Sequence, residues 1–199
     1  ADALFRFPNQ YPPTNGVAAF TQAIAAHWAS FTSQAIDPAT HVTVTSGCTE
    51  AIAATLLGLL NPGDEVILFE PFYDSYRACL AMAGATPRYV TLRWPHFAFD
   101  ESELRAAFTP KTRAILINTP HNPTGKVFSR AELDLIASLC HEHDAIAITD
   151  EVYEHLVYDG AEHVRMATLP GMAERTITLS SLGKTFSFTG WKIGYITAD

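Results

Sequence analysis

Two patterns of apolar and polar positions recur along this chain: one is typical of β-strands and the other of α-helices. Short β-branched or continuously apolar runs predict seven strands, at residues 41–47, 65–71, 87–92, 113–120, 145–151, 175–181 and 194–198. Helical spacing of apolar residues predicts helices between most of these strands, at residues 49–60, 75–84, 101–108 and 129–143. Ser129 followed three residues later by Glu132 is the capping-box pattern, which marks the start of the last of these helices.

This order of elements predicts an α/β fold, a three-layer α/β/α domain with a mostly parallel seven-stranded sheet covered on both faces. The strand at 194–198 follows its predecessor too closely for a helical crossover, so we expect it to enter the sheet antiparallel. Residues 1–35 read as a turn-rich arm and a helix at 18–31 that pack outside the sheet. Residues 36–199 then form the main part of the same domain.

Composition excludes several functional classes. The 199 residues are 48% hydrophobic, enough for one sizeable core, and the formal net charge of −8 argues against a nucleic-acid partner. No apolar run is long enough to span a membrane, and the first residues lack a signal-peptide pattern. Cys48, Cys79 and Cys140 fit neither a disulfide framework nor paired zinc ligands, which favours a reducing, cytoplasmic location.

Polar and aromatic side chains follow the predicted strands at the points where those strands end. In open α/β sheets, ligands bind beyond the carboxyl ends of the strands. The residues concerned are Ser46, Gly47, Cys48 and Thr49, then Tyr73, then Asn118 and Asn122, then Asp150 and Tyr153, and finally Ser180, Ser181 and Lys184. Each alone has an ordinary explanation as a turn, a core aromatic, a cap or a surface charge. Their occurrence together on one edge favours a binding site.

These groups suit the chemistry of one cofactor, pyridoxal 5′-phosphate. A small-residue loop at a helix start binds a phosphate, and an aromatic side chain can lie on the pyridine ring. A buried carboxylate such as Asp150 keeps the ring nitrogen protonated, so that the ring can withdraw electrons. Lys184 lies in the segment 179–194, which reads as buried, and a desolvated lysine can form a Schiff base. We therefore expect Lys184 to be a covalent anchor and proton carrier, with Lys192 as a second cation for the phosphate.

Three segments carry a resemblance to a known family. The sequences "NTPHNPTGK", "TDEVYEH" and "SLGKTFSFTGWKIGY" resemble the signature segments of the fold-type I pyridoxal-phosphate aminotransferases of class I and II. Within that family the chain is similar to the kynurenine, glutamine and methionine aminotransferases. The resemblance runs from "NQYPPTNG" to "GYITAD" and covers nearly the whole chain.

The resemblance implies a role for each of the predicted site residues. It implies a phosphate site formed by Gly47, Cys48, Thr49, Ser181 and Lys192. It implies that Tyr73 stacks on the ring, Asp150 pairs with the ring nitrogen, Asn122 and Tyr153 bind the phenolic oxygen, Asn118 lies beside the substrate carboxylate, and Lys184 forms the Schiff base. It also implies that Tyr11 reaches the phosphate of another subunit, and hence a homodimer with shared active sites.

The implied activity is transfer of an amino group from an aromatic, sulfur-containing or glutamine-like α-amino acid to a 2-oxo acid, with Lys184, Asp150 and Tyr153 as catalytic residues. A cysteine-conjugate β-lyase and a non-catalytic, aminotransferase-like effector-binding domain remain alternatives. Members of the family are longer, so we expect a C-terminal small domain and an N-terminal lid segment to lie outside this chain.

Two other site types fail on the sequence. The "GKT" at residues 183–185 is no phosphate-binding P-loop, because the position that requires a glycine is Thr178. The "HEHD" at residues 141–144 lies at the end of an amphipathic helix with no further ligands nearby in sequence, so no metal site is predicted there.

Overall fold

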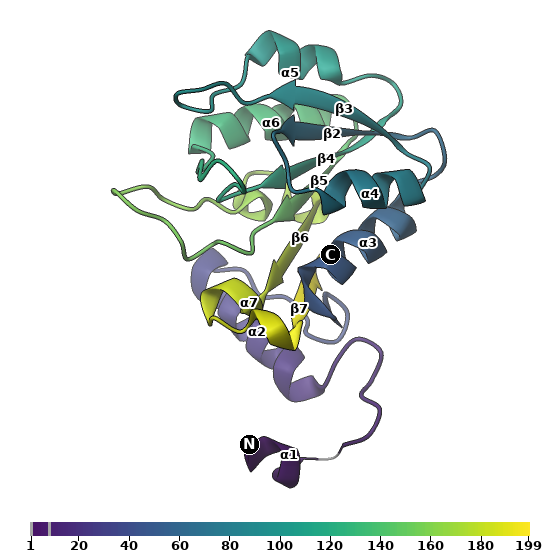
Figure 1. Cartoon of the computed structure of the whole chain (residues 1–199), viewed down its shortest axis with the longest axis vertical. Coiled ribbons are helices and arrows are strands. Elements are labelled where there is room, and N and C mark those ends of the chain that lie inside the picture. The colour runs from purple at the N-terminus through teal and green to yellow at the C-terminus, as the bar shows by residue number, and fades with distance from the viewer. Residues whose placement is uncertain (1, 8) are drawn as a thin grey trace.

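The computed structural model describes residues 2–7 and 9–199, and a seven-stranded sheet forms its centre (Figure 1). The strands lie in the order β1-β7-β6-β5-β4-β2-β3. Their bounds are Val42–Thr45 (β1), Glu65–Glu70 (β2), Thr86–Thr91 (β3), Thr112–Asn118 (β4), Ile146–Asp150 (β5), Thr176–Ser181 (β6) and Gly194–Thr197 (β7). Each predicted strand is therefore confirmed, within a few residues at its ends.

The direction of β7 determines which groups meet at the edge of the sheet where the predicted site residues lie. This strand pairs antiparallel with both β6 and β1, whereas every other neighbouring pair is parallel. The predicted reversal of the last strand is confirmed. Because β7 reverses between β1 and β6, those two strands run in the same direction as the rest. The carboxyl ends of the parallel strands and the amino end of β7 consequently lie at one edge.

Helices cover both faces of the sheet, which confirms the three-layer prediction. In β2, Val66 and Leu68 belong to one core, and Ile67 and Phe69 belong to the other, because successive side chains point to opposite faces. Helices α3 (Gly47–Leu59) and α4 (Ser75–Met82) pack on the first face and lie together in Figure 1. Helices α5 (Glu101–Ala107) and α6 (Arg130–Glu142) supply apolar residues to the second.

Helix α6 begins as the sequence predicts. The Ser129 hydroxyl accepts a hydrogen bond from the Glu132 backbone N–H at 3.3 Å. In return, the Glu132 carboxylate accepts one from the Ser129 N–H at 2.8 Å. This capping box satisfies two N–H groups that the helix itself leaves without partners.

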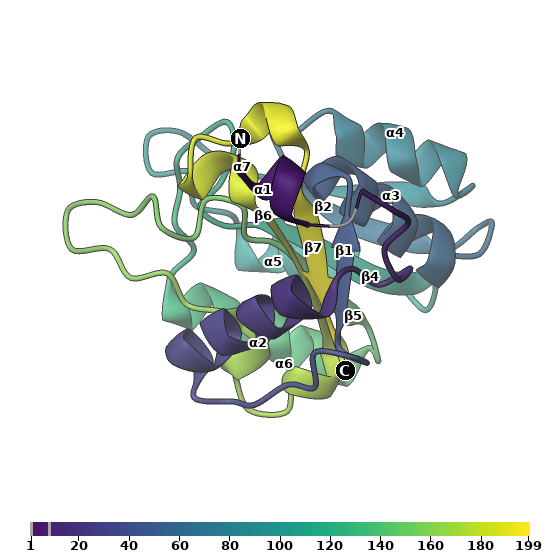
Figure 2. The same ribbon diagram turned by 90° about the horizontal axis from the view of Figure 1, so that it is seen from below.

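The N-terminal segment packs at the β1 side of the sheet. Helix α2 (Ala18–Thr32) passes across the sheet in Figure 2 and contacts it through a small cluster of Ile24, Val42 and Tyr195. A short helix, α1 (Asp2–Arg6), precedes it and stands away from the body at the end of an extended stretch (Figure 1). The sequence did not predict α1. Within residues 2–7 and 9–199, no helix has both the length and the apolar character that crossing a membrane requires.

Candidate active site

One cavity at this edge of the sheet brings together the predicted site residues, with the exception of Tyr11, Ser46 and Ser180. The predicted residues that line it are Gly47, Cys48, Thr49, Tyr73, Asn118, Asn122, Asp150, Tyr153, Ser181, Lys184 and Lys192. They come from the ends of β1, β2, β4, β5 and β6 and from the segment that leads into β7. Tyr11 lies on the N-terminal arm, outside the cavity, with 99% of its surface exposed.

Asn118 fixes two walls of the cavity to each other. It pairs directly with Asp150 across β4 and β5, and its side-chain amide donates a hydrogen bond to the Asp150 backbone carbonyl at 2.9 Å. Its side-chain oxygen accepts a hydrogen bond from the Asn122 N–H at 2.7 Å. The buried Asn118 side chain therefore positions both the turn that carries Asn122 and the strand end that carries Asp150.

A buried carboxylate forms the floor of the cavity. Asp150 is only 4% exposed, and burial raises its pKa above the ordinary value. Three hydrogen bonds oppose this shift, from the Tyr76 hydroxyl at 2.7 Å, the Val152 N–H at 3.3 Å and the Cys48 thiol at 3.7 Å. The sequence did not lead us to Tyr76. A tyrosine three residues after Tyr73 could, however, have been expected to line the same wall of the cavity.

The start of α3 has the features of an anion-binding site. Helix α3 begins at Gly47, one residue after β1 ends. The side chain of its N-cap residue, Ser46, makes no capping hydrogen bond, while the Ser46 N–H donates to the Glu50 carboxylate. The backbone of Lys192 has a left-handed conformation, and this lysine lies against Gly47: a Cβ built on Gly47 would be 3.4 Å from the Lys192 Nζ. Free N–H groups, the helix dipole and an ammonium group together favour a phosphate at this point.

Gly194 allows β7 to approach the same helix start. A Cβ built on Gly194 would lie 2.4 Å from the Gly47 carbonyl carbon and 2.6 Å from the Cys48 nitrogen, both of them backbone atoms. Gly194→Ala must therefore displace the backbone of Gly47 and Cys48 at the start of α3. We expect it to lower the free energy of unfolding by about 1–3 kcal/mol, as overpacking does, in denaturant titrations.

Gly58→Ala is the matched control for this substitution. Gly58 lies within α3, and a Cβ built on it meets no atom within 4 Å. Alanine in a helix interior is favoured over glycine by about 1 kcal/mol, so this variant should be as stable as the parent or more so. Equal stability of the Gly194→Ala variant and the parent would contradict the close approach.

Lys184 lies at the rim of the cavity rather than in its depth. It stands on the one-turn helix α7 (Leu182–Thr185), with its Nζ 5.5 Å from the centre of the Tyr153 ring. The residue is exposed, so the sequence-based expectation of a buried lysine is wrong. The physical reason is its place: α7 follows the end of β6, beyond the sheet, whereas the preceding Gly183 is buried.

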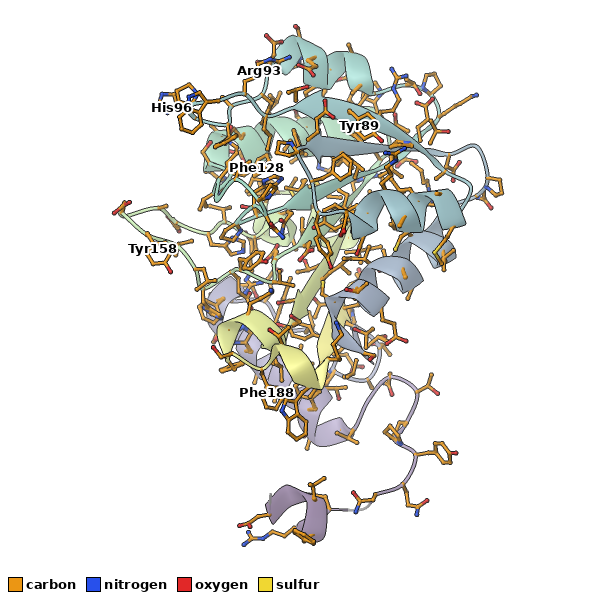
Figure 3. The ribbon with its side chains drawn as sticks, viewed as in Figure 1. Tyr89, Arg93, His96, Phe128, Tyr158 and Phe188 are labelled. Carbon is orange, nitrogen blue, oxygen red and sulfur yellow. The ribbon has the colours of Figure 1, made fainter. Side chains whose placement is uncertain are left out.

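A buried cation anchors the loop that follows β5 and carries Tyr153. The Arg165 guanidinium donates to the Glu151 carboxylate at 2.7 Å and also bonds Glu154, and all three residues are buried. Burial alone would raise the pKa of Glu154, but a hydrogen bond from His27 and the charge of Arg165 bring that pKa below its ordinary value. The outer part of this loop projects from the body and carries Tyr158 (Figure 3). The ion pairs thus fix the base of the loop beside the cavity.

Comparison with known proteins relates this arrangement to one family. Residues 4–199 match the family described as aminotransferase class I and II. The chain is 54% identical to a probable N-succinyldiaminopimelate aminotransferase of Mycobacterium tuberculosis, over 98% of this chain and 49% of that protein. It is 46% identical to human kynurenine–oxoglutarate transaminase 1, over 94% of this chain and 47% of that protein.

A solved structure gives the same relationship. The N-succinyldiaminopimelate aminotransferase from Mycobacterium tuberculosis superposes with a TM-score of 0.97 and 52% sequence identity. The superposition covers 100% of this chain and 52% of that one. The chain therefore spans about half the length of the relatives that it matches.

Proposed function

This chain belongs to the class I and II aminotransferase family, and from that premise we propose that its cavity binds pyridoxal 5′-phosphate and supports transfer of an amino group from an α-amino acid to a 2-oxo acid. One observation carries the proposal. A buried carboxylate, a helix start whose N-cap side chain makes no capping hydrogen bond and which has a lysine beside it, and a second lysine line the same cavity.

The groups in the cavity fit each part of this cofactor. The N–H groups of Gly47, Cys48 and Thr49, with Lys192 and the Ser181 hydroxyl, would hold the phosphate dianion. Asp150 would pair with the protonated ring nitrogen, and Tyr73 would lie against the ring. Asn122 and Tyr153 would donate to the phenolic oxygen, with Asn118 close to the substrate carboxylate.

When bound, pyridoxal phosphate supplies an aldehyde that condenses with amines and a protonated ring that withdraws electrons from the bonds to the substrate Cα. Lys184 would hold the cofactor through its Nζ and, once the substrate amine takes its place, would accept the proton from the substrate Cα and give it back. Its Nζ lies in the cavity, 5.5 Å from the centre of the Tyr153 ring. Asp150 would hold a proton on the ring nitrogen.

A half-reaction tests this function. Protein loaded with pyridoxal phosphate is given an α-amino acid but no 2-oxo acid acceptor. It should lose its absorbance at about 400 nm and release one molecule of the oxo acid derived from that amino acid per cofactor. Addition of a 2-oxo acid should restore the band, because the amino group then leaves the cofactor. Aromatic, sulfur-containing, glutamine-like and N-succinylated diamino acids are the substrates to compare.

The same experiment separates the alternatives. Continuous release of pyruvate and ammonia from a cysteine conjugate, with no oxo acid present, would indicate a β-lyase instead. Binding of amino acids with neither spectral change nor product would indicate an effector-binding domain and would contradict the proposed function.

We also propose that the protein acts as a homodimer in which Tyr11 reaches the phosphate of the other subunit. The support is the exposure of the N-terminal segment: Tyr11 is 99% exposed, and Leu4 and Phe5 of α1 and the following Phe7 are exposed as well. Exposed apolar side chains gathered in one segment favour a partner surface. A solution mass equal to a single chain, measured by sedimentation of the loaded protein, would contradict this proposal.

A further inference from the structure

Tyr76 makes the shortest hydrogen bond to the carboxylate of Asp150. Its hydroxyl donates to Oδ2 at 2.7 Å, whereas Oδ1 accepts from the Val152 N–H at 3.3 Å and the Cys48 thiol at 3.7 Å. A carboxylate offers about four acceptor sites. The chain itself therefore fills most of them and leaves room for one further donor from the cavity.

The electrostatics of this group keep the two side-chain donors protonated. Burial and the neighbouring charge of Asp150 raise the pKa of Tyr76 well above its ordinary value, and the same two causes raise the pKa of the Cys48 thiol. Both therefore remain donors at neutral pH, and each stabilises the ionised form of Asp150 against the effect of its burial.

The Tyr76 ring is held rigidly in this position. It is 2% exposed and belongs to the core between α3, α4 and the sheet. It also packs edge-to-face against Tyr73, with ring centres 5.7 Å apart and planes at 82°. The hydroxyl is thus a fixed donor whose direction is set by the core rather than by solvent.

We propose that Tyr76, with Cys48 as a weaker second donor, is a positioning residue that keeps Asp150 ionised and directs its carboxylate toward the ring nitrogen of pyridoxal phosphate. The inference rests on the proposed function. Asp150 and the ring nitrogen compete for one proton, and a carboxylate that loses a hydrogen bond becomes a stronger base. Loss of the Tyr76 hydroxyl should therefore move that proton from the ring nitrogen toward Asp150.

Tyr76→Phe in the loaded protein tests this role. With the cofactor labelled with ¹⁵N in its ring, the nitrogen resonance should move toward that of an unprotonated pyridine. The proton equilibrium should change about tenfold to hundredfold, the range expected for one hydrogen bond to a charged group. The kcat should fall by a similar factor with little change in KM, because the proposed role of Tyr76 acts through Asp150 rather than on the substrate. Cys48→Ala should give a smaller change in the same direction.

Tyr195→Phe is the matched control. Tyr195 is another buried tyrosine, on β7, and it lies outside the cavity. Removal of its hydroxyl should leave the nitrogen resonance of the bound cofactor unchanged, which separates a local effect on Asp150 from a general loss of stability.

The outcomes distinguish the two proposals. If the parent protein does not bind pyridoxal phosphate covalently, the proposed function fails and the inference fails with it. If the parent binds it covalently and Tyr76→Phe leaves the nitrogen resonance unchanged, the positioning role is overturned while the function stands. Should Tyr76→Phe not fold, an unchanged resonance in Cys48→Ala would overturn the role in the same way.

Discussion

Replacing Lys184 with alanine should abolish the covalent attachment of pyridoxal phosphate and the absorbance at about 400 nm that accompanies it. Lys184 and Lys192 both line the cavity, but they point to different parts of it. The Lys192 amine lies against Gly47 at the helix start, whereas the Lys184 amine lies over the Tyr153 ring. Lys192 therefore cannot take over the attachment. Turnover should fall by about 10²–10⁴-fold or more, as for loss of a general base.

Borohydride reduction of the loaded protein gives the direct measurement. The reduced cofactor should remain attached to the peptide that contains Lys184, which the mass of that peptide will show. The Lys184→Ala variant should carry no reduced cofactor. Lys192→Ala should keep the label but bind the cofactor more weakly, and the exposed Lys111→Ala should resemble the parent. If another lysine of the Lys184→Ala variant carried the reduced cofactor in the same yield as the parent protein, the assignment of Lys184 as the attachment site would be wrong.

The sequence predicted the elements of this fold because their signals are local. Period-two and continuous apolar runs identify the strands, and the short gap before residue 194 favoured the reversal of β7 that the structure shows. The cavity could be predicted for a related reason: parallel strands bring their carboxyl ends to one edge, so residues far apart in sequence, such as Asn118 and Asp150, had to meet.

What the sequence could not give depends on contacts between elements. Tyr76 reads as an ordinary helix residue until α4 is packed on the sheet and its hydroxyl reaches Asp150. Gly194 reads as the start of a strand until the backbone of β7 lies against Gly47. The exposure of Lys184 was mispredicted because small and apolar neighbours indicate burial on average, whereas exposure depends on whether α7 lies over the sheet or beyond its edge.

Asp150→Asn should separate attachment of the cofactor from its use. Asparagine nearly preserves the shape of the side chain but cannot carry the charge that holds a proton on the ring nitrogen. Removing one partner of a buried ion pair costs about 3–5 kcal/mol, which corresponds to about two to four orders of magnitude in rate. The variant should still react with pyridoxal phosphate through Lys184 and keep its absorbance, while kcat for the half-reaction falls by that factor. Near-normal turnover would remove Asp150 from the mechanism.

The same substitution should make the cofactor-free protein more stable. Burial raises the folded-state pKa of Asp150 above its unfolded value, so ionisation of this group opposes folding as the pH rises. Its contribution to stability is complete below the ordinary carboxyl pKa of 3.8 and is lost as the pH rises through the folded-state pKa. Asp150→Asn removes this loss. Its unfolding free energy should therefore exceed that of the parent at neutral pH, and the difference should shrink on acidification. A cofactor-free variant that is less stable than the parent at pH 7 would show instead that Tyr76, Val152 and Cys48 more than offset the cost of burying the charge.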